Sequence, residues 1–197
     1  MTTTTPSAYP VTFEVAYPED PGRFSILIRW LLAIPHLVIV SILGNLAQVL
    51  ALLAFIAFFV ILFTKRYPEG MFRLVVGVYR WQYNVNVYML FHPQPYPPFS
   101  FDAGVYPHFQ FDVIRQAEYR RWMPLVKWLL AVPHYIVIVF LAVVAIPVGL
   151  IAVIAVVFTG TFPRWAFDFL VGVGRWCSRV SAYVLLLVDQ YPPFSMR

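Results

Sequence analysis

The sequence predicts an all-α membrane protein with minor β structure, in which two tandem repeats each form a transmembrane helical hairpin and an interfacial amphipathic helix. Three observations predict this class: an apolar composition, an internal repeat and the placement of the charges. Hydrophobic residues make up 61% of the chain and charged residues 12%, with a mean hydropathy of +0.74. Soluble domains are about 25% charged, and a core of this size cannot bury so much apolar surface. Lipid is the solvent that resolves the mismatch.

The internal repeat is carried by four motifs that recur in the same order. The pairs are Arg29–His36 with Lys127–His134, Phe63-Thr64 with Phe158-Thr159, Arg80-Trp81 with Arg175-Trp176, and Tyr96–Ser100 with Tyr191–Ser195. We place the units at residues 9–102 and 106–197, after an N-terminal tail (1–8) that we expect to be disordered. Both units run in the same sense, which predicts that an axis along the membrane normal relates them.

Each unit opens with a predicted short strand. Val11, Phe13 and Val15 are separated by Thr12 and Glu14, which is the period of a half-buried strand. In the second unit the apolar residues of that pattern are Phe109, Phe111 and Val113. We expect these strands to flank the hairpins on the cytoplasmic side of the membrane.

A long apolar run follows each strand. The run from Trp30 to Phe63 contains no charge. One straight helix of that length would measure roughly 50 Å, well beyond the ~30 Å hydrocarbon core of a bilayer. The run therefore predicts two helices, with a turn near Gly44-Asn45 in the first unit and near Pro147-Val148-Gly149 in the second. We place the hairpins at about 24–63 and 124–162.

The third segment of each unit predicts an amphipathic helix, at about 71–84 and 165–179. Its polar stripe consists of Arg73, Gly77, Arg80 and Asn84 in the first unit, and of Asp168, Gly172, Arg175 and Arg179 in the second. An arginine is costly in the middle of a bilayer, so we expect the helix to lie along the cytoplasmic interface.

The charges predict one orientation for the whole chain. All 14 Lys and Arg residues lie outside the apolar runs or just inside the first helix of a hairpin, where Arg29 and Lys127 can snorkel. The positive-inside rule then places both termini in the cytoplasm, in a multi-pass protein of the inner (plasma) membrane. We expect the net charge of +5 to contact anionic lipid headgroups and not nucleic acid.

These motifs resemble a family of uncharacterised bacterial membrane proteins, classed as a domain of unknown function. Its pattern joins a Lys/Arg-Trp-Leu-Leu-Ala-Ile-Pro-His segment, a Phe-Thr pair, a Gly-Val-x-Arg-Trp helix and Tyr-Pro-Pro-Phe-Ser. The resemblance covers nearly the whole chain twice, and it is better in the second unit, because the first has Lys65 where Gly160 stands. It implies a membrane location and no activity, so it transfers no catalytic residue.

His36 and His134 are the candidate cofactor ligands. Each lies about two turns into the first helix of its hairpin, and facing histidines from two helices can hold a haem or a metal. We favour a structural interpretation, in which each histidine serves a backbone carbonyl freed by the neighbouring Pro35 or Pro133. No cofactor is therefore predicted, and haem is the alternative.

Arg80 and Arg175, each followed by a tryptophan, are the candidate lipid-headgroup residues. With Trp81 and Trp176 they would either bind a lipid phosphate or fix the depth of the helix. The chain shows no nucleophile with a base, so we expect no enzymatic activity.

We expect an accessory or scaffold subunit of a membrane assembly, with other membrane subunits or a second copy as partners. One alternative is a membrane-shaping wedge, because helical arms of about 14–18 apolar residues are short for a full span of ~20. The other alternative is a small channel or carrier with a site at the repeat axis.

Overall fold

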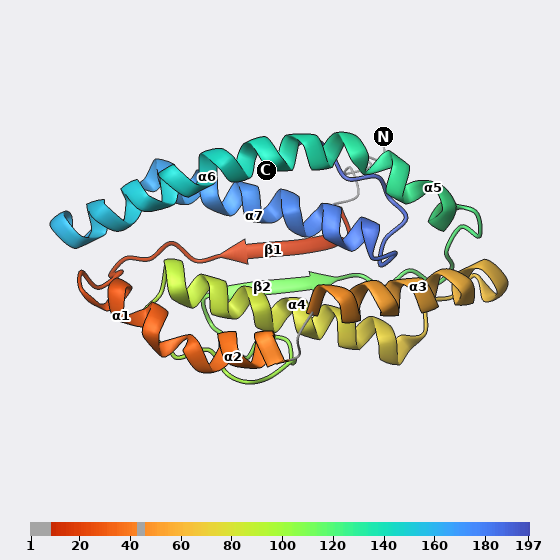
Figure 1. Ribbon diagram of the computed structural model, residues 1–197, viewed down its shortest axis with the longest axis horizontal. Coiled ribbons are helices and arrows are strands. Elements are labelled where there is room, and N and C mark those ends of the chain that lie inside the picture. Colours follow the sequence, from red (N-terminus) through yellow and green to blue (C-terminus); the bar gives the residue numbers. More distant parts are fainter. Residues whose placement is uncertain (1–8, 43–45) are drawn as a thin grey trace, which may run out of the picture.

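The computed structural model describes residues 9–42 and 46–197, so the tail predicted at 1–8 lies outside the described residues (Figure 1). In the first unit the elements are β1 (Val11–Val15), α1 (Ser25–Leu32), α2 (Ile34–Ile42), α3 (Leu46–Thr64) and α4 (Glu69–Leu90). In the second unit they are β2 (Phe109–Val113), α5 (Met123–Leu130), α6 (Val132–Thr159) and α7 (Arg164–Val184). The fold is thus mostly helical with one small sheet, as the sequence predicts.

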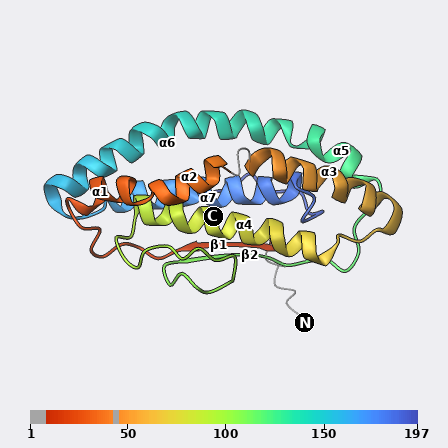
Figure 2. The same cartoon turned by 60° about the horizontal axis from the view of Figure 1, so that its bottom comes forward.

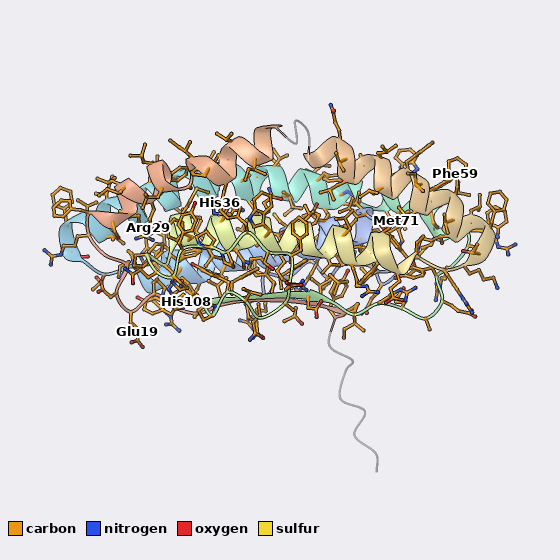
Figure 3. All side chains as sticks on the ribbon, turned by 90° about the horizontal axis from the view of Figure 1, so that it is seen from below. Glu19, Arg29, His36, Phe59, Met71 and His108 are labelled. Carbon is orange, nitrogen blue, oxygen red and sulfur yellow. The ribbon has the colours of Figure 1, made fainter. Side chains whose placement is uncertain are left out.

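The elements form three layers. One layer holds two apolar rows, α1–α2–α3 and α5–α6, the next holds α4 and α7, and the last is the ribbon of β1 and β2 (Figures 2 and 3). Contacts of α3 with α4 and of α6 with α7 join the first two layers, and those of α4 with β2 and of α7 with β1 join the last two. In Figure 3, Phe59 of α3 lies on the side of the apolar rows, and Glu19 and His108 lie on the side of the ribbon.

The two apolar rows run side by side in opposite directions. Helix α1 contacts α6, and α3 contacts α5. At one end the Arg23 guanidinium donates to the carbonyl of Thr159 (3.3 Å), and at the other the Tyr119 amide donates to the carbonyl of Lys65 (2.9 Å). The beginning of each row therefore meets the end of the other.

The hairpin predicted for the second unit is wrong. Helix α6 continues from Val132 to Thr159 with Pro147 inside it, so no turn forms at Pro147-Val148-Gly149. A proline removes one helical hydrogen bond, and an otherwise helical segment can accept that loss with a bend. The helix is visibly arched in Figure 2. The turn predicted at Gly44-Asn45 lies outside the described residues, while α2 and α3 lie one after the other along the molecule (Figures 1 and 2).

The two strands pair with each other across the units. They are antiparallel, with Phe13 opposite Phe111 and Val11 opposite Val113. Their buried side chains face the helices, and Thr12, Glu14, Gln110 and Asp112 are exposed on the other face. The alternation of apolar and polar residues in the sequence therefore corresponds to the alternation of buried and exposed side chains in the ribbon.

Each strand packs on the central helix of the other unit. Strand β1 contacts α7, and β2 contacts α4. The Phe13 ring lies so close to Gly174 that a Cβ there would approach it to 2.8 Å. Since Phe13 and Phe111 are equivalent in the repeat and opposite in the ribbon, a pseudo-two-fold axis passes between them, perpendicular to the layers.

The apolar rows expose most of their side chains. The segment Met123–Thr159 is the one described helical stretch long and apolar enough to cross a membrane. Its most apolar 18-residue window has a mean hydropathy of 3.2, and only 6% of that window is buried. We call the exposed side chains of both rows the apolar face; its large members include Leu27, Leu31, Leu52, Phe55, Phe59, Ile136, Val139, Phe140, Val143, Ile146, Ile154 and Phe158. Such a surface is far larger than a soluble monomer exposes.

Candidate functional site

The two predicted histidines are fully buried, each inside its own unit. His36 Nδ1 accepts a hydrogen bond from Trp81 Nε1 (3.2 Å), and His134 Nδ1 accepts one from Trp176 Nε1 (3.0 Å). Burial lowers the pKa of both imidazoles, which favours the neutral form that this hydrogen bond requires. The tryptophans predicted for the headgroups thus lie in the interior as partners of the histidines.

A phenylalanine completes each cluster. The His36 ring stacks on Phe99 and the His134 ring on Phe194, both with ring centroids 4.0 Å apart. We call these the histidine clusters: His36, Trp81, Tyr96 and Phe99 in the first unit, and His134, Trp176, Tyr191 and Phe194 in the second. They explain the repeat, because the Pro-His, Arg-Trp and Tyr-Pro-Pro-Phe motifs meet there.

The tyrosine of each cluster serves the backbone. The Tyr96 hydroxyl donates to the carbonyl of Leu32 (3.1 Å), and the Tyr191 hydroxyl donates to that of Leu130 (3.2 Å). These carbonyls lie at the breaks between α1 and α2 and between α5 and α6. The carbonyls freed by Pro35 and Pro133 are those of Leu31 and Leu129, one residue earlier. The tyrosines therefore bind a neighbouring carbonyl, and the histidines bind the tryptophans.

The two histidines belong to separate clusters. Each imidazole is stacked on a phenylalanine of its own unit and has Nδ1 bonded to the tryptophan of that unit. Within residues 9–42 and 46–197, no group of three or more His, Cys, Asp and Glu side chains is placed to hold a metal ion. The hydrogen bond of each histidine Nδ1 is to an indole, which corrects the expectation that the histidine serves the carbonyl freed by Pro35 or Pro133.

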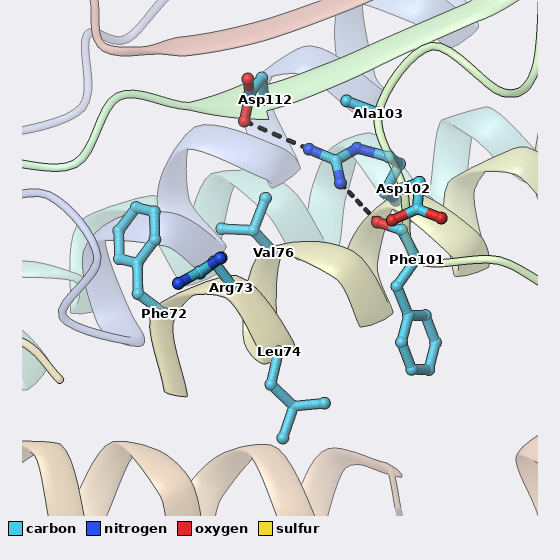
Figure 4. A pocket seen from close by; sticks show the side chains of 9 residues that line it. Phe72, Arg73, Leu74, Val76, Phe101, Asp102, Ala103 and Asp112 are labelled. Atoms are coloured by element: carbon cyan, nitrogen blue, oxygen red, sulfur yellow. Dashed lines mark hydrogen bonds and ion pairs between the residues drawn. The ribbon is translucent and has the colours of Figure 1, made fainter. Parts of the chain in front are cut away.

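Arg80 and Arg175 point toward the ribbon and away from the apolar face. Arg80 donates to the carbonyls of Phe111 (3.0 Å) and Phe101 (2.5 Å) and pairs with Asp112 (3.2 Å); Figure 4 marks the last two contacts. Arg175 donates to the carbonyls of Phe13 (3.2 Å) and Met196 (3.0 Å). Each arginine ties the strand of the other unit to the last segment of its own. Their guanidinium donors are used inside the protein, which corrects the prediction that they contact lipid phosphate.

Arg29 and Lys127 are the buried cations that the snorkelling prediction placed wrongly. Both side chains are about 1% exposed. Arg29 donates to the carbonyls of Tyr88 (3.1 Å) and Pro21, and Lys127 donates to that of Val188 (2.8 Å) and pairs with Asp189 (2.7 Å). They fasten the apolar rows to the segments at and after the ends of α4 and α7, where backbone carbonyls favour a cation.

Six of the exposed cations lie at the two ends of the apolar rows. We call these the end cations: Arg23 and Arg164 at one end, and Lys65, Arg66, Arg120 and Arg121 at the other. The ends are fixed by the contact of Arg23 with Thr159 and by that of Tyr119 with Lys65. Their position on each side of an apolar run was the signal in the sequence, and long basic side chains there reach headgroups.

The comparison with protein families gives one match. Residues 23–100 and 121–196 each match Domain of unknown function (DUF4389). Each range lies within one of the repeat units read from the sequence, ends within two residues of it and begins after its opening strand. Neither the curated proteins nor the solved structures contain a match.

Proposed function

The chain belongs to the DUF4389 family, with two copies of its domain, and we propose that it is a non-enzymatic membrane-shaping protein that lies flat in one leaflet. The family carries no assigned activity, so the proposal rests on the layered structure.

One observation carries the proposal: the three layers run side by side along the length of the molecule (Figures 2 and 3). The segment Met123–Thr159 has 37 residues and would measure about 55 Å, almost twice the hydrocarbon thickness. If it stood across the bilayer, α4, α7 and the exposed Glu14 and Asp112 of the ribbon would enter the hydrocarbon with it, at a large cost. Lying flat, it buries the apolar face and keeps the ribbon in water.

The end cations suit this placement. An interfacial protein binds through its buried apolar area and through attraction between basic side chains and anionic lipids. The end cations flank the apolar face at both ends. A multi-pass topology has no support from this geometry, and the ribbon would face the water on the side that the positive-inside rule assigns to the cytoplasm.

Membrane shaping follows from the insertion of the protein's volume into one leaflet only. A slab with two long helical rows expands one leaflet and leaves the other unchanged, so the bilayer bends toward the protein. The membrane-shaping wedge, one of the alternatives that the sequence left open, is therefore the function that we favour. A channel or carrier has less support, because a slab confined to one leaflet makes no path across.

The test is addition of the purified protein to vesicles of phosphatidylcholine with phosphatidylglycerol, followed by flotation and electron microscopy. We expect binding and tubulation. Replacing Arg23, Arg66 and Arg121 by glutamine should weaken binding, by about 1 kcal/mol per cation. Arg73→Gln is the matched control, because that exposed arginine is paired with Glu69. Vesicles that bind the wild-type protein and stay round would reject membrane shaping.

An accessory or scaffold subunit is the second candidate, and the unpartnered apolar face favours it. Lipid or the helices of another membrane subunit can cover such a face. A scaffold should co-purify with fixed partners in mild detergent. In the vesicle test above, it should bind and leave the vesicles round.

A further inference from the structure

Between the two apolar rows lies a cleft of about 550 Å³, within the range of small-molecule sites. Leu50, Ala51 and Ala54 of α3 form one wall, and Tyr135 and Ile138 of α6 form the other. Helices α4 and α7 form the floor. Figure 1 shows α3 and α6 on opposite sides of the middle of the molecule. The cleft therefore lies within the layer that carries the apolar face.

The floor of the cleft carries hydroxyl groups. Tyr79 of α4 and Ser181 of α7 line it, and their side chains are hydrogen-bonding neighbours. Tyr135 adds a third hydroxyl on the α6 wall, where its side chain is 45% exposed. A hydroxyl both donates and accepts, so this floor suits a small head that carries a hydroxyl or a carbonyl.

The repeat does not impose this floor. When Arg80-Trp81 is aligned with Arg175-Trp176, the equivalent of Tyr79 is Gly174 and the equivalent of Ser181 is Asn86. The histidine clusters, by contrast, recur residue by residue. The pair of hydroxyl groups on the floor of the cleft therefore has no counterpart at the equivalent positions of the repeat.

The chemistry of the lining selects the occupant. No Lys, Arg, Asp or Glu is among the described residues that line the cleft, so an ionised head there would lose its hydration without a partner. The walls are apolar and continuous with the apolar face, so they suit a hydrocarbon chain. We propose that the cleft binds a neutral single-chain lipid with a hydroxyl or carbonyl head, its head against Tyr79 and Ser181 and its chain directed into the leaflet.

This inference rests on the flat placement in the membrane, because the chain of the lipid must leave the cleft into hydrocarbon. The probe is hexadecanol with a diazirine in its chain, in phosphatidylcholine vesicles that carry the full-length protein. We expect photolabelling to concentrate on the peptides of α3, α6 and α7 that line the cleft. Unlabelled hexadecanol should compete better than hexadecane.

Two variants and one control test the site. Ala54→Phe fills the cleft and should remove the localised label, whereas Ala142→Phe places the same ring on an exposed position of α6 and should leave it. Tyr79→Phe removes one hydroxyl and should weaken hexadecanol about 2–10-fold, the equivalent of one neutral hydrogen bond, without affecting hexadecane.

The outcomes separate the two proposals. If the protein floats with vesicles but the label spreads evenly over both rows, or if Ala54→Phe labels like the wild type, the lipid site is rejected and the flat placement stands. If the protein does not float with the vesicles, the flat placement is rejected, and the lipid site that depends on it is rejected with it. Competition by hexadecyl phosphate as strong as that by hexadecanol would contradict a neutral head.

Discussion

At the residue scale, the buried polar groups explain the sequence better than any catalytic role. His36 and His134 look like ligands in the sequence because they recur at the same place in two helices. In the structure each has its tryptophan as a donor and its phenylalanine as a stacking partner. Their recurrence in both units correctly indicated that the two histidines occupy equivalent positions in the fold. Their tryptophan partners lie 42–45 positions away and their phenylalanine partners still farther, so only the folded chain shows which aromatic residue meets which histidine.

A first prediction concerns the histidine cluster. Trp81→Phe removes the indole N–H and leaves His36 Nδ1 buried without a donor, so the free energy of unfolding should fall by about 1–3 kcal/mol. Thermal unfolding in detergent, followed by circular dichroism, measures the change. Trp128→Phe is the matched control, because Trp128 is 65% exposed. Equal effects of the two substitutions would contradict a structural role for the cluster.

A second prediction concerns pH and His92. This histidine lies under the ring of His108, with centroids 4.0 Å apart, and its Nε2 lies 2.8 Å from the carbonyl of Ala16. Burial lowers its pKa from 6.5; the carbonyl of Ala16 opposes the shift, and His108 and Arg29 add to it. The unfolded chain therefore binds the proton more readily, and stability should fall as the pH drops below 6.5.

The measurement is the midpoint of thermal unfolding between pH 8 and pH 5, a span chosen around the usual titration of histidine. His92→Leu places there the residue that stands at the equivalent Leu187 of the second unit. The variant should lose part of the acid sensitivity. An unchanged pH profile would show that His92 contributes nothing to it.

At the scale of the elements, local patterns predicted where the strands and the central helices form. The alternation from Val11 to Val15 is visible in the ribbon. The polar stripe of α4 was wrongly expected to face water, because Gly77 and Asn84 are buried between the layers. The apolar runs were harder, because helices of this kind look alike whether they cross a bilayer or lie in it. Their length indicated a turn, and we placed it at Pro147 because proline is common in turns. The pairing of the strands across the units left no local pattern, since it depends on contacts about 98 residues apart in a repeat.

A third prediction follows from the continuous helix. Pro147 interrupts the hydrogen bonds of α6, so Pro147→Ala should raise the free energy of unfolding, by up to about 3 kcal/mol. Pro133→Ala should change it little, because Pro133 lies in the first turn, where its missing N–H has no helical partner to lose. Denaturant unfolding of both variants in the same detergent gives the comparison. A loss of stability with Pro147→Ala would favour a turn at that position in the membrane.

At the scale of the whole molecule, the layers determine how the protein meets a bilayer. The apolar face, the central helices and the polar ribbon are stacked in that order, so one direction through the molecule runs from hydrocarbon to water. The pseudo-two-fold axis follows the same direction. The sequence predicted an axis along the membrane normal, and the flat placement that we propose keeps this axis and changes the depth.

A fourth prediction gives that depth. Spin labels on single cysteines at Val126, Val143 and Ile154, in a Cys177→Ser background, sample the exposed side of one row from beginning to end. A flat, arched row places Val126 and Ile154 at similar depths near one interface, with Val143 deeper. Depth is measured by the ratio of oxygen to nickel-chelate accessibility, with the chelate on one side of the vesicle membrane, so that it reaches both ends of a flat row or neither. A crossing helix would instead place Val126 and Ile154 at opposite interfaces, with Val143 between them, and that profile would overturn the flat placement.

The strand that each unit gives to the other has a consequence for ancestry. A single unit with this fold would leave its central helix uncovered and its strand without a partner, because β1 packs on α7 and β2 on α4. Two identical copies related by a true two-fold axis would remedy both defects. The strand of each copy would pair with the strand of the other and pack on its central helix. The present chain has the form of such a dimer after gene duplication and fusion, with the segment between Asp102 and Tyr106 as the join. A one-copy relative should accordingly exist as an intertwined homodimer.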